Sequence, residues 1–228
     1  MSYIDTSFDQ LFDARPSLPW WPWVGRDFAT SSTRTLVVGE SIYEWSEEDR
    51  ATFEKRYEQK SGLRETHRRH AMAFDRNSPY VRNIERAVFG RSRPQESQKL
   101  GFWTSVAYHN LVLEALPSRT RKHRPTLAHF VKGWEEVLEL CELMAVEQIL
   151  VYGVSSAYAL REVCKRRVLP CTVQKSGAAV SNCRPRIGVV KTRERNIKLV
   201  FIRHPSEYFS WEGWSPIIRS NLDLPPLR

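Results

Sequence analysis

Two short apolar runs, each ending in glycine, constrain the fold of this chain more than any other feature of its sequence. Residues 34–39 (RTLVVG) and 148–153 (QILVYG) are rich in aliphatic and β-branched side chains. Such runs are typical of strands buried in a parallel sheet, with a tight turn at the carboxyl end. Helical patterns follow at residues 46–60, where Ser46 is the expected N-cap, and at 155–165.

The rest of the chain continues this alternation of strands and helices. Residues 127–143 carry apolar side chains at helical spacing, and residues 186–190 and 197–202 have the character of strands. Residues 61–98 are basic and look irregular, and the segment that starts at Phe102 fits either a strand or a helix. The alternation predicts an α/β fold with three α/β/α layers around a central, mostly parallel sheet.

The N-terminal segment is expected to differ from the rest. Pro19 and Pro22 interrupt a stretch that also holds Trp20, Trp21 and Trp23, so a regular helix is excluded there. We expect residues 1–30 to form an extended arm, rich in Trp and Pro, that packs on a single domain spanning residues 1–228.

Charge and composition narrow the classes of function. The chain has 35 Lys and Arg against 26 Asp and Glu, a net charge of +9, which favours a polyanionic partner. Charge alone does not distinguish DNA, RNA and acidic lipid as the partner. It is also compatible with a basic soluble protein that has no polyanionic partner. With no apolar run of membrane-spanning length and no signal peptide, we expect a soluble cytoplasmic protein that does not bind membranes. The spacing of the four cysteines matches no metal site, so buried thiols in a reducing compartment are expected.

Polar residues follow several of the expected strands, and in α/β sheets such loops carry the functional groups. The first strand leads into Gly39-Glu40-Ser41-Ile42-Tyr43, the last into His204-Pro205-Ser206, and Asn110 lies between them in the sequence. The order of these motifs, together with LVYGVSSAYAL at 150–160, resembles the uracil-DNA glycosylase superfamily. In that family the first motif has forms such as GQDPY and GEAPG, and the last is a His-Pro-Ser loop.

The resemblance covers about residues 18–216 and implies a uracil-DNA glycosylase-like fold without a cofactor or metal. It implies catalytic roles for Glu40, Asn110 and His204. It also implies substrate-binding residues in the first and last motifs, with Gly39, Ser41 and Tyr43 around the base and Ser206, together with nearby arginines, holding phosphate. In the first motif, Ser41 replaces the water-activating Asp of GQDPY and Ile42 replaces Pro, and residues 207–211 depart from the HPSPLS pattern of the last motif. These departures resemble a divergent branch, some of whose members act on hypermodified pyrimidines such as glucosylated hydroxymethylcytosine of phage DNA.

The chemistry of N-glycosidic cleavage suits these residue types. The sugar gains positive charge, which the carboxylate of Glu40 can stabilise while it holds or deprotonates water. An N–H of His204 can stabilise the negative charge on the departing base. Asn110 offers a donor and an acceptor to the edge of a flipped pyrimidine. Singly, each residue also has a structural interpretation: Glu40 as an acid near a helix start, Asn110 as a turn or cap residue, and His204 as a strand-end histidine.

The expected partner is single- or double-stranded DNA that contains a modified pyrimidine, bound by a monomer. The candidates for phosphate contacts are the cations Arg64, Arg68, Arg69, Arg121 and Lys122. The candidates for an aromatic wedge, which would fill the gap left by a flipped base, are Tyr208, Phe209 and Trp211. The same residues also fit solvated surface or core. An inactive DNA-binding module of the same fold is the alternative function, and a nucleotide-binding hydrolase ranks third because Gly39 lacks the other residues of a phosphate-binding loop. Which base is recognised, and whether for repair or phage defence, stays open.

Overall fold

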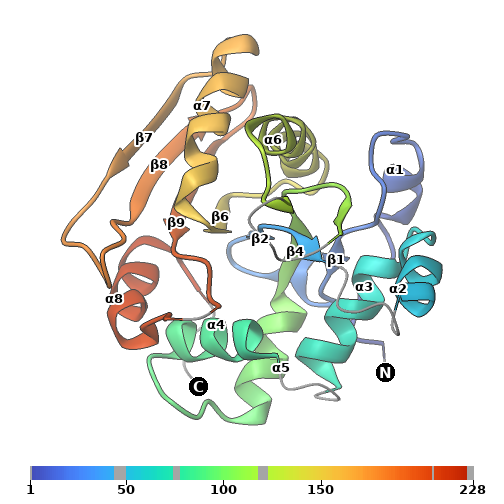
Figure 1. Cartoon of the computed structure of the whole chain (residues 1–228), viewed down its shortest axis with the longest axis horizontal. Helices are drawn as coiled ribbons and strands as arrows, with labels where there is room; N and C mark the ends of the chain where they lie inside the picture. Colours follow the sequence, from blue (N-terminus) through green and yellow to red (C-terminus); the bar gives the residue numbers. More distant parts are fainter. Residues whose placement is uncertain (1, 44–49, 74–77, 118–122, 207, 225–228) are drawn as a thin grey trace.

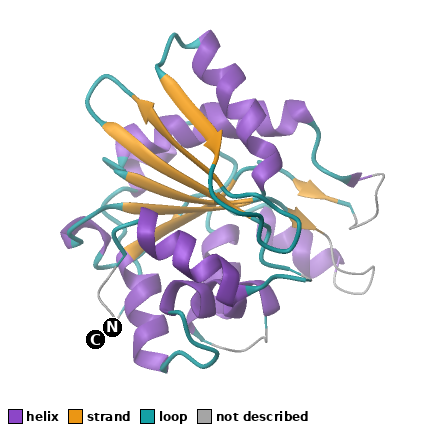
Figure 2. Ribbon diagram, turned by 90° about the vertical axis from the view of Figure 1, so that its left-hand side faces the viewer, coloured by secondary structure: helices purple, strands orange, loops and turns teal. Residues whose placement is uncertain are grey.

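The computed structural model describes residues 2–43, 50–73, 78–117, 123–206 and 208–224. At its centre is a seven-stranded sheet with helices on both faces (Figure 1, Figure 2). Its strands, in spatial order, are β1 (Trp23–Val24), β4 (Val106–Asn110), β2 (Thr35–Gly39), β6 (Gln148–Tyr152), β9 (Asn196–Ile202), β8 (Arg186–Lys191) and β7 (Cys171–Lys175). The four strands from β4 to β9 are mutually parallel, whereas β1 pairs antiparallel with β4, β8 with β9 and β7 with β8. The predicted α/β class with a mostly parallel central sheet is therefore confirmed.

The helices form a layer on each face of this sheet. On one face lie α1 (Asp9–Asp13), α6 (Leu127–Leu143) and α7 (Ala157–Arg166). The opposite face is covered by α3 (Gly62–His67), the π-helical turn η2 (Arg68–Met72), α4 (Pro79–Phe89), α5 (Glu96–Ser105) and α8 (Trp211–Asn221). The smaller elements are α2 (Arg50–Tyr57), β3 (Ile42–Tyr43), β5 (Ala115–Leu116) and the 3-10 turns η1 (Phe28–Thr30) and η4 (Val154–Ser156).

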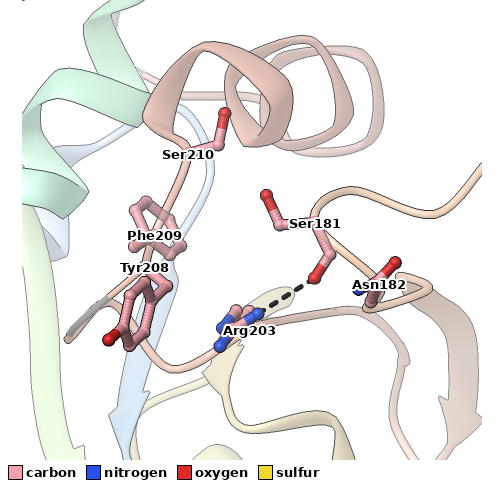
Figure 3. A pocket seen from close by; sticks show the side chains of 6 residues that line it. All are labelled: Ser181, Asn182, Arg203, Tyr208, Phe209 and Ser210. Atoms are coloured by element: carbon pink, nitrogen blue, oxygen red, sulfur yellow. Dashed lines mark hydrogen bonds between the residues drawn. The ribbon is translucent and has the colours of Figure 1, made fainter.

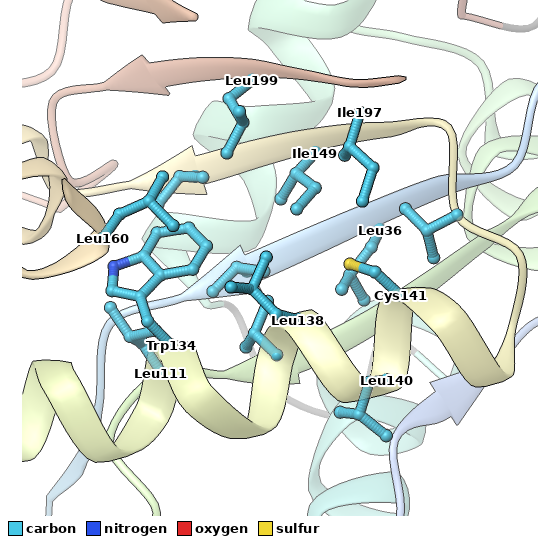
Figure 4. Close-up of a cluster of buried hydrophobic side chains, with 14 of the residues drawn as sticks. Leu36, Leu111, Trp134, Leu138, Leu140, Cys141, Ile149, Leu160, Ile197 and Leu199 are labelled. Carbon is cyan, nitrogen blue, oxygen red and sulfur yellow. The ribbon is translucent and has the colours of Figure 1, made fainter. Parts of the chain in front are cut away.

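Alternation along each central strand produces two hydrophobic cores. In β2, for example, Leu36 and Val38 face α6 and α7, whereas Val37 faces α4 and α8. Figure 4 shows the first core, in which Trp134 and Leu138 of α6 lie against the sheet. Every residue of β2, β4 and β6 is buried, which explains why β2 and β6 are nearly continuous apolar runs in the sequence.

The segment interpreted as irregular is largely helical, and this expectation was wrong. Residues 61–98 contain α3, η2, α4 and the start of α5. In α4 the apolar residues Val81, Ile84 and Val88 lie at helical spacing, and that face is buried against α8 and the sheet. Arginines between them hid the period. The strand β7 and the helix α8 were not expected either, and the predicted N-cap Ser46 lies outside the described residues.

The Trp-rich arm is held by hydrogen bonds from its indoles. Trp20 Nε1 donates to the Tyr57 carbonyl and Trp23 Nε1 to the Trp103 carbonyl, both at 2.8 Å. Trp23 and Val24 also form β1, which pairs with β4, so the arm contributes an edge strand. A short helix, α1, precedes it and was not expected.

The four cysteines are free thiols, of which Cys141 and Cys164 are buried and Cys171 and Cys183 are half-buried. The expectation of four buried thiols thus holds for two of them. Within the described ranges, no group of three or more His, Cys, Asp or Glu side chains is placed to hold a metal ion. In the same ranges, no helix combines the length and apolar character needed to cross a bilayer.

Candidate functional site

The four parallel strands end almost in line, and this brings together residues that are far apart in the sequence. Gly39 pairs with Asn110, and Tyr152 pairs with Ile202. Glu40 follows β2 directly, and His204 lies two residues beyond β9. Asn110, Glu40 and His204 therefore lie side by side at the end of the sheet where the four parallel strands have their carboxyl ends. From β4 to β9 this end of the sheet spans three strand spacings, about 14 Å.

The absence of a side chain at Gly39 allows a polar pair to sit against the backbone of β2. A Cβ atom there would lie 2.3 Å from Asn110 Oδ1 and 2.5 Å from the Tyr108 hydroxyl. The Tyr108 hydroxyl donates a hydrogen bond of 2.8 Å to Asn110 Oδ1, and the Asn110 residue is only 2% exposed. Any larger residue at position 39 would displace this amide.

Glu40 extends from the end of β2 toward the end of β6. Its Oε2 lies 2.6 Å from the place that a Cβ of Gly153 would occupy, and Gly153 has a positive φ of 92°. Glycine is thus favoured at residue 153 both by its backbone and by this carboxylate. Burial raises the pKa of the half-buried Glu40 carboxyl, and the positive charge of Arg124 partly opposes this shift.

His204 is held at the edge by contacts from two neighbouring elements. Its half-buried imidazole lies edge-on to the Tyr152 ring, with 6.4 Å between centroids. Asn83 of α4 donates through Nδ2 to the Pro205 carbonyl at 3.0 Å, which fixes the His-Pro-Ser loop to the helix. Ser206, the predicted phosphate ligand, is exposed beside it.

The remaining residues of the first motif tie two loops of the site together. β3 (Ile42–Tyr43) pairs in parallel with β5 (Ala115–Leu116), so the loop after β2 is held to the loop after β4. Ile42 therefore takes a strand position where the family pattern has Pro. The Tyr43 ring packs against the core on the α6 face, and its hydroxyl is buried without a hydrogen-bond partner in the described structure. Ser41 is half-buried next to them.

The candidates for phosphate contact differ in their placement. Arg64 is only 5% exposed, and its guanidinium donates to both carboxylate oxygens of Asp9 at 2.7 and 3.1 Å and to the Pro22 carbonyl. Arg64 therefore fixes the N-terminal arm, which corrects the expectation of a phosphate contact. Arg68 is exposed and paired with Glu65, and Arg69 is half-buried next to it. Arg121 and Lys122 lie outside the described residues.

The three aromatic candidates for a wedge separate in the same way. Tyr208 is 82% exposed and has a positive φ of 58°, which is uncommon for a residue with a side chain. Phe209 instead stacks on Trp214 in the core, with 6.2 Å between centroids, and Trp211 packs against the same core. Of the three, Tyr208 alone projects into solvent, beside a cavity of about 580 Å³ (Figure 3).

Sequence reasoning missed several residues that support the site: Tyr108, Tyr152, Asn83 and His67. Tyr108 could have been found from alternation, because it lies two residues before Asn110 on the same strand face. His67 is 1% exposed and is enclosed by the rings of Trp23, Trp103 and Tyr108, a contact that depends entirely on tertiary packing.

Comparison with known proteins does not place the chain in a family. No protein-family model matches the sequence, and a search of curated proteins finds no similar sequence.

Proposed function

We propose that this protein is a monofunctional DNA glycosylase that hydrolyses the N-glycosidic bond of a flipped modified or damaged pyrimidine and leaves an abasic site. The proposal is carried by one observation: Glu40, Asn110 and His204 lie along a single edge of the sheet although 164 positions separate the first from the last. That arrangement is what the resemblance to the uracil-DNA glycosylase superfamily requires. The fold class and the basic charge of the chain are compatible with it.

In the proposed reaction, the carboxylate of Glu40 accepts a proton from water while the water oxygen bonds to C1′ of the sugar. The bond between C1′ and the base nitrogen breaks, and its electron pair leaves with the base. An N–H of His204 donates to the pyrimidine oxygen on which negative charge develops. The raised pKa of Glu40 makes this carboxylate more basic, and Arg124 favours its ionised form. Activity should therefore fall as the pH drops through a pKa above the usual range of Glu.

Asn110 supplies recognition of the base in this scheme. The hydrogen bond from Tyr108 fixes the orientation of its amide, which fits a group that must discriminate donor from acceptor edges. Since Asn110 is 2% exposed, the proposal requires its amide to become accessible when DNA binds.

The burial of Asn110 also favours a second candidate function, a DNA-binding module of the same fold without catalytic activity. In that case the amide serves the packing of β4 against β2 and never contacts a base. Such a protein would bind DNA in a salt-dependent manner and would release no base.

The test uses oligonucleotides that carry uracil, hydroxymethylcytosine or glucosylated hydroxymethylcytosine, followed by alkali, which cleaves the strand at abasic sites. Natural phage DNAs with other modified bases extend the substrate range. We expect Glu40→Gln and His204→Ala to lower the rate by about 100-fold or more, in line with the loss of a general base or an oxyanion donor.

Glu135→Gln, which removes an exposed carboxylate from α6, is the matched control and should retain the activity of the wild type. If the protein binds these DNAs but none of them is cleaved, the glycosylase proposal fails and the binding module is the better description.

A further inference from the structure

Most of the excess positive charge of the chain lies in one continuous segment outside the site described above. Residues 163–193 contain eight Lys and Arg and no Asp or Glu, whereas the whole chain has a net charge of +9. This segment comprises the end of α7, the antiparallel strands β7 and β8, and the loop 176–185 that joins these strands. In Figure 1 the two strands form the outer edge of the sheet.

The register places the loop end of this hairpin beside the His-Pro-Ser loop. Lys175 pairs with Arg186, and Arg186 pairs with Phe201 near the end of β9. The loop is also joined to the end of β9 directly, because Arg203 Nη1 donates to the Ser181 carbonyl at 3.0 Å. The far end of the hairpin, where Lys191 pairs with Asn196, lies beside the amino end of β9, away from the His-Pro-Ser loop.

A cavity of about 580 Å³ lies at this junction (Figure 3). The hairpin loop, the end of β9 and the start of α8 contribute its lining residues, which are Ser181, Asn182, Arg203, Tyr208, Phe209 and Ser210. Three of them, Ser181, Asn182 and Tyr208, have positive φ values of 46°, 62° and 58°. Left-handed backbone at such residues costs energy and is retained where the surroundings impose it, often at binding sites.

The cations at the loop end are not neutralised by acids in the described part of the chain. Lys175 and Arg184 are exposed, Arg186 is half-buried, and no described acidic side chain forms an ion pair with any of them. Lys175 and Arg186 moreover face each other across the two strands, and like charges in that position destabilise a sheet. A polyanionic ligand would convert this repulsion into attraction.

We propose that the loop end of the β7–β8 hairpin, with Lys175, Arg184 and Arg186, binds the phosphate backbone of the DNA strand that flanks the nucleotide held near His204. The identification of the polyanion as DNA rests on the proposed function. It is further favoured by Tyr208, whose exposed ring beside the cavity offers a stacking surface for a base. Acidic lipid headgroups and acidic peptides have no base to stack there.

The test measures binding of the full-length protein to a fluorescently labelled duplex without any modified base, between 50 and 200 mM salt. The loop-end variant carries Lys175→Ala and Arg184→Ala. The matched control carries Lys191→Ala and Arg193→Ala, which remove two exposed cations from the other end of the same hairpin. We expect the loop-end variant to bind more weakly and to reduce the slope of log K against log salt by about 1.8, because each lost phosphate contact contributes about 0.9.

The control should retain the affinity and the slope of the wild type. Equal effects of the two variants, or no effect of the loop-end variant, would overturn the proposal. Since this duplex is not a substrate, the result is independent of base excision. If the loop-end variant lowers the salt slope more than the control but the protein excises no base, only the glycosylase proposal fails. If the protein excises a base but the two variants bind DNA equally, only the proposed hairpin contact fails.

Discussion

We expect acid to destabilise this protein through two histidines that are buried in neutral form. His67 lies among aromatic rings, and His109 is fully buried in β4. None of their four ring nitrogens has a hydrogen-bond partner in the described structure. Burial lowers the pKa of His67 to about 3, with a further contribution from His70, and lowers that of His109 to about 4 against an opposing effect of Glu136.

The magnitude follows from the difference in protonation between the unfolded and folded chain. In the unfolded chain both imidazoles titrate near the usual pKa of about 6.5, so that state binds more protons than the folded one below pH 7. The stability that comes from keeping the two histidines neutral is therefore fully present above the pKa of the unfolded chain, and it is lost as the pH falls below this pKa toward that of the folded protein. Between pH 7 and pH 5 the free energy of unfolding should fall by about 2 kcal/mol through each of His67 and His109.

Urea denaturation at pH 7 and pH 5 tests this expectation with His67→Phe, which keeps a ring in the aromatic cluster but cannot titrate. The loss of stability on acidification should be about 2 kcal/mol smaller in this variant than in the wild type. Phe102→Leu, which alters the same core without a titratable group, should keep the full loss. Burial raises the pKa of Glu40 and Glu85, which favours folding at lower pH, so the difference between variants is the relevant quantity. An unchanged pH dependence in His67→Phe would refute the reasoning.

Three further predictions concern single positions. Gly39→Ala should cost about 1–3 kcal/mol of stability through overpacking against Asn110 and should abolish excision, and an active variant of normal stability would contradict the geometry described. Arg64→Met leaves Asp9 unpaired and should lower the free energy of unfolding by about 3 kcal/mol in chemical denaturation, while the salt dependence of DNA binding stays unchanged. Tyr208→Gly relieves a left-handed backbone and should raise stability by about 1 kcal/mol but slow excision; faster excision would exclude a role as a wedge.

Much of the fold was predictable because its central strands are buried on both faces. Residues 34–39 and 148–153 matched β2 and β6 closely, and α6 has the boundaries predicted from its apolar spacing. Prediction failed for α4, where arginines between the apolar residues hid the helical spacing, and for α8, which was not expected at all. Residues 163–193 were not singled out either; their charge is readable from the sequence, but the pairing of β7, β8 and β9 that brings the hairpin loop to the end of β9 is not.

For the candidate site, the sequence by itself determined which polar residues follow the apolar strands: Glu40, Asn110 and His204. It could not determine that Arg64 pairs with Asp9, or that Tyr208 projects outward while Phe209 packs on Trp214. The physical reason is that a strand ending is encoded by local side-chain pattern, whereas the partner of a buried charge can lie far away in the sequence and the direction of a loop side chain depends on the segments packed around it. Only tertiary structure brings those segments into contact.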